Sequence, residues 1–137
     1  RSNAPTIEEA AQTGRLILLA EDNETNREVM QEQLRLQGRT CELAEDGAIA
    51  LHMWKNNPGR YALLMTDCHM PNLDGFKLTE AIRAAEHDNM HLPIIAVTAN
   101  AMQGDKEKCL AAGMTDYLTK PIDPDKLADM FEKWLIQ

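Results

Sequence analysis

Two kinds of apolar pattern alternate along the chain. The first kind is a short run rich in apolar and β-branched residues, found at Leu16 to Ala20, Thr40 to Ala44, Ala62 to Met65, Ile94 to Thr98 and Asp116 to Thr119. Strands that are buried on both faces have such runs, because neither face requires a regular alternation of apolar and polar residues. We therefore predict five strands, most of them inside the molecule.

The second kind of pattern returns apolar residues every three or four positions, as an amphipathic helix does. It covers Asn26 to Gln37, Gly47 to Asn56, Phe76 to Ala85, Gln103 to Ala112 and Asp123 to Leu135. A strand and a helix thus alternate five times, which predicts a parallel sheet joined by right-handed crossovers. The predicted fold class is a doubly wound α/β domain, with a five-stranded parallel sheet and five helices on both faces.

The first residues fall outside this pattern. The length of 137 residues is that of one domain. Arg1 to Ala4 resemble the remnant of an expression tag, and Thr6 to Gly14 are polar and only weakly helical. Residues 1–14 are therefore predicted to be a tag remnant and a linker, and residues 15–137 the domain. At the other end, Trp134 and Leu135 fit either the core or an interface.

Composition excludes several classes of partner. The formal net charge of −8 argues against direct binding to nucleic acid or to an anionic membrane surface. No apolar run approaches the ~20 residues of a membrane-spanning helix. Cys41, Cys68 and Cys109 lie far apart, without the spacing of a zinc site or a disulfide framework. We expect thiols used as small apolar residues, and a cytoplasmic domain.

Polar side chains gather where the predicted strands end. Glu21 and Asp22 follow the first strand, Asp67 follows the third, Thr98 ends the fourth, and Lys120 follows the fifth. In a parallel α/β sheet all the carboxyl ends lie at one edge, which is where such folds bind ligands. These five residues are therefore predicted to form one site.

The chemistry of these groups is that of phosphoryl transfer. Three carboxylates repel one another and recruit a cation, and an oxygen-only site with room for water favours Mg²⁺. A lysine binds phosphate as a point charge, and a hydroxyl hydrogen-bonds a phosphoryl oxygen. With these groups in place a carboxylate can accept a phosphoryl group. Asp67 is the candidate acceptor, because the next helix is better capped by Asp74.

Four ordered motifs resemble those of the receiver domain of two-component signalling. They are Ala20-Glu21-Asp22-Asn23, Thr66-Asp67-Cys68-His69-Met70-Pro71 with Asp74-Gly75, Ile95-Ala96-Val97-Thr98-Ala99, and Tyr117-Leu118-Thr119-Lys120-Pro121. The resemblance covers nearly the whole chain from Leu16 onward. It implies a flavodoxin-like sheet with strand order 2-1-3-4-5.

The resemblance also implies a magnesium site. Asp67 matches the phosphoacceptor, Asp22 a direct Mg²⁺ ligand, and Glu21 an acidic partner that acts through water. His69 matches the position whose backbone carbonyl binds the metal. The His69 imidazole is then not a ligand, and we expect it to point toward solvent.

Three further positions match the receiver switch. Lys120 matches the residue that pairs with the phosphoryl oxygens, Thr98 the switch hydroxyl, and Tyr117 the aromatic residue whose rotamer follows Thr98. Tyr117 can also be read as an ordinary half-buried strand residue. Phosphorylation is expected to bias a surface formed by the fourth predicted helix, the fifth strand and the fifth helix.

The motifs look most like receivers embedded in unorthodox hybrid sensor histidine kinases. Such a receiver takes its phosphoryl group from a histidine kinase module and passes it to a histidine phosphotransfer domain, in the cytoplasmic part of a sensor that can be anchored in the inner membrane. A stand-alone response regulator that binds a partner protein is the near alternative. A Mg²⁺-dependent phosphohydrolase is a remote one, because no insertion is long enough for a cap. A flavin-binding module is remoter still, because the first loop is acidic and poor in glycine.

Overall fold

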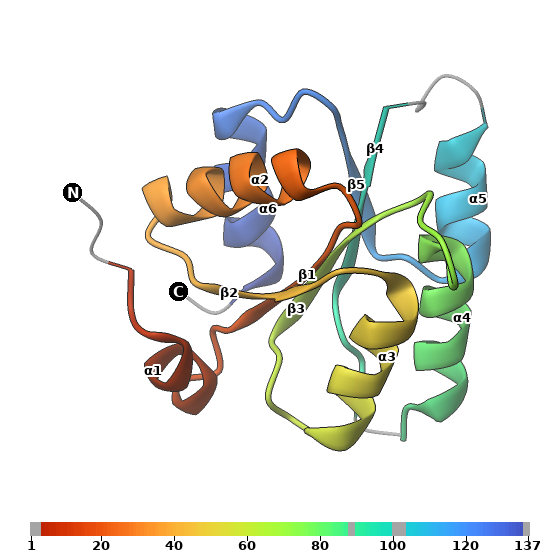
Figure 1. Cartoon of the computed structure of the whole chain (residues 1–137), viewed down its shortest axis with the longest axis horizontal. Helices are drawn as coiled ribbons and strands as arrows, with labels where there is room; N and C mark the ends of the chain where they lie inside the picture. Colours follow the sequence, from red (N-terminus) through yellow and green to blue (C-terminus); the bar gives the residue numbers. More distant parts are fainter. Residues whose placement is uncertain (1–3, 88–89, 100–103, 136–137) are drawn as a thin grey trace.

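Five parallel strands form the centre of the molecule, in a computed structural model that describes residues 4–87, 90–99 and 104–135. They are β1 (Ile17–Ala20), β2 (Cys41–Ala44), β3 (Leu63–Asp67), β4 (Ile94–Thr98) and β5 (Asp116–Thr119). Their spatial order is β2-β1-β3-β4-β5 (Figure 1). The predicted doubly wound sheet and its strand order are thus confirmed.

Six helices surround the sheet in the described residues. They are α1 (Ile7–Gln12), α2 (Glu24–Leu36), α3 (Gly47–Asn56), α4 (Gly75–Ala85), α5 (Asp105–Ala112) and α6 (Pro124–Trp134). Helices α2 and α6 lie on one face of the sheet, and α3, α4 and α5 lie on the other (Figure 1). The helix α1 precedes the five that were predicted, so the fourth and fifth predicted helices are α5 and α6.

The sheet divides the core into two apolar clusters. Leu18 and Leu64 point into the cluster that includes residues of α3, α4 and α5, whereas Leu19 and Met65 point into the cluster with α2 and α6. All four side chains are almost completely buried. Both faces of β1 and β3 are therefore apolar, which is why their sequences read as continuous runs.

Side-chain caps fix where the helices begin. Asn23 Oδ1 accepts a hydrogen bond from the backbone N–H of Asn26 at 2.9 Å, so α2 begins at Glu24, two residues before its predicted start. Asp74 Oδ1 likewise accepts from the N–H of Lys77 at 2.8 Å and caps α4, as predicted. For α5, the predicted first residue, Gln103, lies outside the described residues.

Within the predicted linker, Ile7–Gln12 form the helix α1, which packs against the domain. Thr6 and Glu9 make a reciprocal capping box at the start of α1, and Ala10 is completely buried. Arg60 bridges Glu8 on α1 and Glu42 on β2, with nitrogen–oxygen distances of 3.1 Å to each carboxylate. The cap, the burial of Ala10 and the ion pair of Glu8 with Arg60 together hold this mostly polar segment against the domain.

The last two described residues, Trp134 and Leu135, pack in or against the core. The side chain of Leu135, just after α6, is buried in the cluster beneath α2 and α6. Trp134 packs against the same cluster, and its Nε1 donates a hydrogen bond to Asp116 Oδ2 at 3.1 Å. Of the two predicted roles for these residues, the structure supports the core.

No helix within the described residues combines the length and the apolar character that crossing a membrane requires.

The three cysteine thiols should resist modification while the chain is folded. Cys41, Cys68 and Cys109 are free and buried. Burial raises the pKa of Cys41 to about 11 and also raises the pKa of Cys68 and Cys109, whose Sγ atoms lie 3.9 Å apart. Iodoacetamide at pH 8 should therefore label the native chain far more slowly than the chain in urea, as counted by intact mass. Rapid labelling of the native chain would contradict this.

The same shifts predict a dependence of stability on pH. The folded chain keeps these thiols protonated at a pH where the unfolded chain has released the protons. The free energy of unfolding should therefore fall as the pH rises above about 8.5. Urea denaturation at a series of pH values measures this effect, and a variant with the three cysteines replaced by alanine, which removes the titrating thiols, should show a smaller loss.

Candidate functional site

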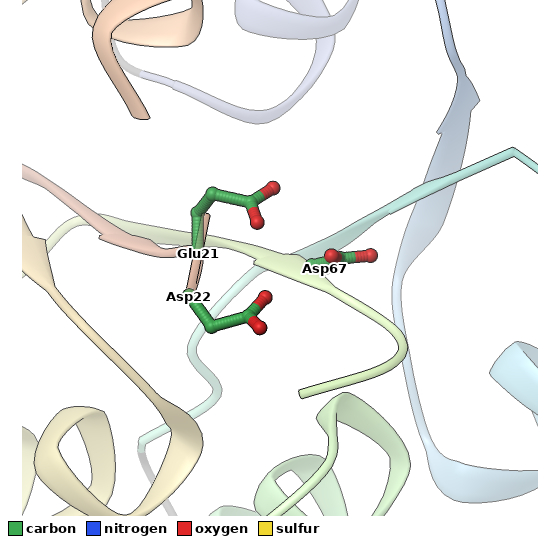
Figure 2. A group of neighbouring side chains, drawn as sticks. All are labelled: Glu21, Asp22 and Asp67. Carbon is green, nitrogen blue, oxygen red and sulfur yellow. The ribbon is translucent and has the colours of Figure 1, made fainter. Parts of the chain in front are cut away.

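The register of the sheet brings three carboxylates to one edge. Ala20 on β1 pairs with Thr66 on β3, so that Glu21 and Asp67, the next residue of each chain segment, emerge side by side. One carboxylate oxygen from each of Glu21, Asp22 and Asp67 lies within 4.8 Å of the others. Figure 2 shows the carboxylates of Glu21 and Asp22 turned toward the side on which Asp67 lies. The predicted acidic cluster is thus present.

Glu21 is the buried member of this cluster. Its side chain has no exposed surface, and its Oε2 accepts a hydrogen bond from the backbone N–H of Asn23 at 3.1 Å. Burial raises the pKa of Glu21, and the neighbouring charge of Asp67 adds to that effect, although the hydrogen bond from Asn23 and the charge of Lys120 oppose it. A second cation near this carboxylate would lower its pKa again.

Lys120 places its ammonium group between two of the carboxylates. Its Nζ lies 3.3 Å from Glu21 Oε1 and 3.5 Å from Asp67 Oδ2. The backbone N–H of Lys120 donates a hydrogen bond to the carbonyl of Thr98 at 2.9 Å. The lysine is therefore held at the carboxyl edge of β4 and β5, next to the acidic cluster, as the sequence predicted.

Thr98 lies at the same edge, but its hydroxyl is engaged elsewhere. The side chain is 1% exposed, and Oγ1 donates a hydrogen bond to Asp105 Oδ2 at 2.8 Å. The Nε2 of His69 lies 3.3 Å from the same carboxylate oxygen. The His69 side chain is 59% exposed, in line with the expected orientation toward solvent, yet its ring nitrogen also contacts Asp105. Its role as a carbonyl ligand stays a prediction.

Tyr117 is a partly buried residue of β5. Its ring packs against the cluster beneath α3, α4 and α5, and Lys106 Nζ lies 5.5 Å from the ring centroid. Tyr117 also lines an open groove between β5 and α6. These contacts fit both interpretations made from the sequence, and the coupling of its rotamer to Thr98 stays a prediction.

Two residues that support the site were not identified from the sequence. Arg27 Nη1 donates to the backbone carbonyls of Glu21 at 2.9 Å and of Asp22 at 3.1 Å, which fixes the turn that carries both carboxylates. Asp105 accepts a hydrogen bond from the hydroxyl of Thr98. These contacts join residues five to seven positions apart, through a turn or loop whose path the sequence does not reveal. An acidic residue at the start of α5 is also what the helix dipole favours.

A methyl group at Gly75 should distort the loop that carries Asp67. The Cβ of Gly75→Ala would lie 2.3 Å from the carbonyl oxygen of Asp67 and 3.0 Å from the Cα of Cys68. Because both atoms belong to the backbone, the loop must move, and we expect the free energy of unfolding to fall by about 3 kcal/mol. Urea denaturation measures this loss.

Gly38→Ala is the control for this variant. Gly38 has a φ of +75°, and nothing lies within 4 Å of the position of its Cβ. Only the left-handed backbone then opposes alanine, at a cost of about 1–2 kcal/mol. Equal losses in the two variants would show that the close approach at Gly75 is not the cause.

The donor set of the acidic cluster suits a hard cation. It offers carboxylate oxygens only, with no thiolate or imidazole among the described members of the cluster. Such oxygens select Mg²⁺, Ca²⁺ or Mn²⁺ rather than zinc or copper. The ammonium of Lys120, which contacts the cluster, and the hydroxyl of Thr98, at the same edge of the sheet, are groups that can bind a phosphoryl group. The edge of the sheet can thus assemble a carboxylate, a cation and a phosphoryl group.

Comparisons with known proteins agree with this chemistry. A family profile described as the response regulator receiver domain matches residues 17–132. Hybrid signal transduction histidine kinase I of Dictyostelium discoideum is 44% identical over 118 residues, which are 83% of this chain and 7% of that protein. Sensor protein EvgS of Escherichia coli is 45% identical over 111 residues, which are 81% of this chain and 9% of that protein. The chain therefore spans less than a tenth of either relative.

Solved structures give the same result. The receiver domain of sensor histidine kinase PA1611 from Pseudomonas aeruginosa, crystallised with a magnesium ion in its active-site cleft, is 43% identical with a TM-score of 0.79, covering 88% of this chain and 97% of that one. The receiver domain of Ssk1 from Saccharomyces cerevisiae, crystallised with the histidine phosphotransfer protein Ypd1, is 30% identical with a TM-score of 0.75, covering 87% of each chain. The chain belongs to the response regulator receiver family.

Proposed function

We propose that this domain is the phosphoacceptor of a phosphorelay within a hybrid sensor histidine kinase, and that Asp67 is the residue phosphorylated. The observation that carries the proposal is the position of Asp67 at the carboxyl end of β3, with its carboxylate beside two further acids and 3.5 Å from the ammonium of Lys120. The parent chain is then a phosphotransferase, and this domain lies in its cytoplasmic part.

Magnesium is the proposed cofactor. The carboxylates of Glu21, Asp22 and Asp67 and the backbone carbonyl of His69 would hold it, with Glu21 acting through water. The buried Glu21 carboxylate, with its raised pKa, is the kind of group that a divalent cation would stabilise in its charged form. When bound, the ion neutralises charge on the carboxylate and on the phosphoryl oxygens.

The chain's own residues then perform the transfer. A carboxylate oxygen of Asp67 attacks the phosphorus of a phosphohistidine whose ring is protonated on its other nitrogen. The oxygen–phosphorus bond forms, the phosphorus–nitrogen bond breaks, and the ring leaves as a neutral imidazole that keeps that proton. The ammonium group of Lys120 contacts Glu21 and Asp67. It would exchange one of these contacts for a contact with a phosphoryl oxygen. The hydroxyl of Thr98 would donate a hydrogen bond to another phosphoryl oxygen.

A histidine phosphotransfer domain is the proposed onward partner. Next to Lys120 a groove runs between α2 and the loop after β5, lined by Val29, Met30, Pro121 and Ile122 among others. Val29 on α2 is 53% exposed although it is apolar. We propose that a helix of the phosphotransfer domain packs on this groove and so brings its histidine to Asp67. The Ssk1 receiver, which resembles this chain, was crystallised with such a protein.

Two steps of one experiment test this function. The purified domain is incubated with acetyl phosphate, with and without Mg²⁺, and then mixed with a histidine phosphotransfer domain while intact masses are recorded. The expected result is a Mg²⁺-dependent gain of one phosphoryl group, followed by its transfer to the second protein. No gain in a folded domain that binds Mg²⁺ would refute the phosphoacceptor function. A gain without onward transfer would favour the stand-alone regulator.

A further inference from the structure

The buried carboxylate of Asp105 contacts both Thr98 and His69, which come from two different segments of the site. Asp105 is the first residue of α5 and is 4% exposed. Its Oδ2 accepts a hydrogen bond from the hydroxyl of Thr98, at the end of β4, with an oxygen–oxygen distance of 2.8 Å. The same atom lies 3.3 Å from Nε2 of His69, in the loop after β3. One carboxylate oxygen therefore contacts both segments that flank the phosphoacceptor.

An ionised carboxylate can only accept hydrogen bonds, so the hydroxyl of Thr98 is the donor in its contact with Asp105. A charged acceptor makes a hydrogen bond about twice as strong as a neutral one. The hydroxyl of Thr98 is therefore bound to a strong acceptor.

A threonine hydroxyl has only one proton to donate. While that proton is donated to Asp105, it is not available to a phosphoryl oxygen on Asp67. The bond to Asp105 must break before the hydroxyl can serve the phosphorylated state. Asp105 then keeps His69 as a neighbour, so that the buried carboxylate is not left alone when Thr98 leaves.

We propose that Asp105 is a positioning residue that opposes the phosphorylated arrangement by retaining the Thr98 hydroxyl. The inference rests on the proposed function, since it assumes that the Thr98 hydroxyl is drawn to a phosphoryl group on Asp67. Asp105 thereby sets how much binding free energy the phosphoryl group must supply to engage Thr98.

The test measures the dissociation constant of beryllium trifluoride, a stable mimic of the aspartyl phosphate, by calorimetric titration in the presence of Mg²⁺. Asp105→Asn keeps the shape of the side chain and weakens the acceptor, so beryllium trifluoride should bind roughly fivefold more tightly than to wild type. Asp105→Ala removes the acceptor, and the gain should be roughly tenfold or more. A residue needed only for folding would weaken binding when replaced, so the direction of the change is informative.

Two further variants isolate the mechanism. Glu107→Gln removes the same charge from the same turn of α5 at an exposed position, and it should leave the dissociation constant unchanged. In a Thr98→Val background, which lacks the hydroxyl, Asp105→Asn should have no effect, so the double-mutant cycle should show strong coupling.

The outcomes separate this inference from the proposed function. If wild type binds no beryllium trifluoride and gains no phosphoryl group, the proposed function fails. If wild type responds, unchanged or weaker binding by Asp105→Asn overturns the role of Asp105. So does an equal gain in Glu107→Gln, or a gain that persists without the Thr98 hydroxyl. Thermal melts of wild type and of each variant check that the compared proteins are folded.

Discussion

Replacing Asp67 with asparagine should reduce phosphorylation by acetyl phosphate from stoichiometric to undetectable. The amide has nearly the same shape as the carboxylate, so the fold should persist, but it lacks the anionic oxygen that attacks phosphorus. It also removes one of the three charges that repel one another at the edge of the sheet, and Asp67 is among the causes of the raised pKa of Glu21. Loss of activity should therefore come without loss of stability.

Intact mass after incubation with acetyl phosphate and Mg²⁺ measures the effect. Glu45→Gln is the matched control, because Glu45 is an exposed carboxylate just after β2 that is not part of the acidic cluster. It should be phosphorylated like wild type. If Asp67→Asn still gains a full phosphoryl group, the acceptor is another residue, and fragmentation of the labelled peptide would locate it.

Lys120→Met should slow phosphorylation by about 10²–10³-fold, the cost of removing one preorganised group that stabilises charge in a transition state. Methionine preserves most of the side-chain length and removes the charge. The ammonium of Lys120 lies within 3.5 Å of carboxylate oxygens of both Glu21 and Asp67. It is therefore close enough to contact a phosphoryl group on Asp67. Its loss should also raise the pKa of Glu21 further, because Lys120 is one of the groups that lower it.

Rates of mass gain at a fixed concentration of acetyl phosphate give the comparison. Lys126→Met is the control, since Lys126 is an exposed residue of α6 whose loss changes the net charge by the same amount. An equal slowing in both variants would assign the effect to overall charge, and a wild-type rate for Lys120→Met would exclude a direct role in the transfer.

The strands and the edge at which they end could be predicted because their physics is local. A buried parallel strand needs apolar residues on both faces, so β1, β3 and β4 appear as continuous runs. Topology then determines that Asp22, Asp67 and Lys120 meet, since parallel strands all end at the same edge. Register completes this arrangement, as the pairing of Ala20 with Thr66 shows.

The sequence could not reveal contacts of side chains that can reach several alternative partners. The hydroxyl of Thr98 could have faced Asp67, and its bond to Asp105 depends on how α5 packs against β4. The packing of α1 against the domain was not predicted either. Its capping box is a local signal that indicates a helix, whereas the burial of Ala10 depends on tertiary packing. The clamp of Arg27 on two backbone carbonyls likewise requires the turn before α2 to be known in space.

The packing of α1 against the domain has a consequence for association between molecules. The strand β2 lies at the edge of the sheet, and an open edge can pair with a strand of another molecule and begin aggregation. The hydroxyl of Thr40, just before β2, is bonded to the carbonyl of Pro5, and Arg60 ties Glu8 on α1 to Glu42 on β2. These contacts hold residues 5–12 against the start of β2, so a strand from another molecule that paired there would have to displace them.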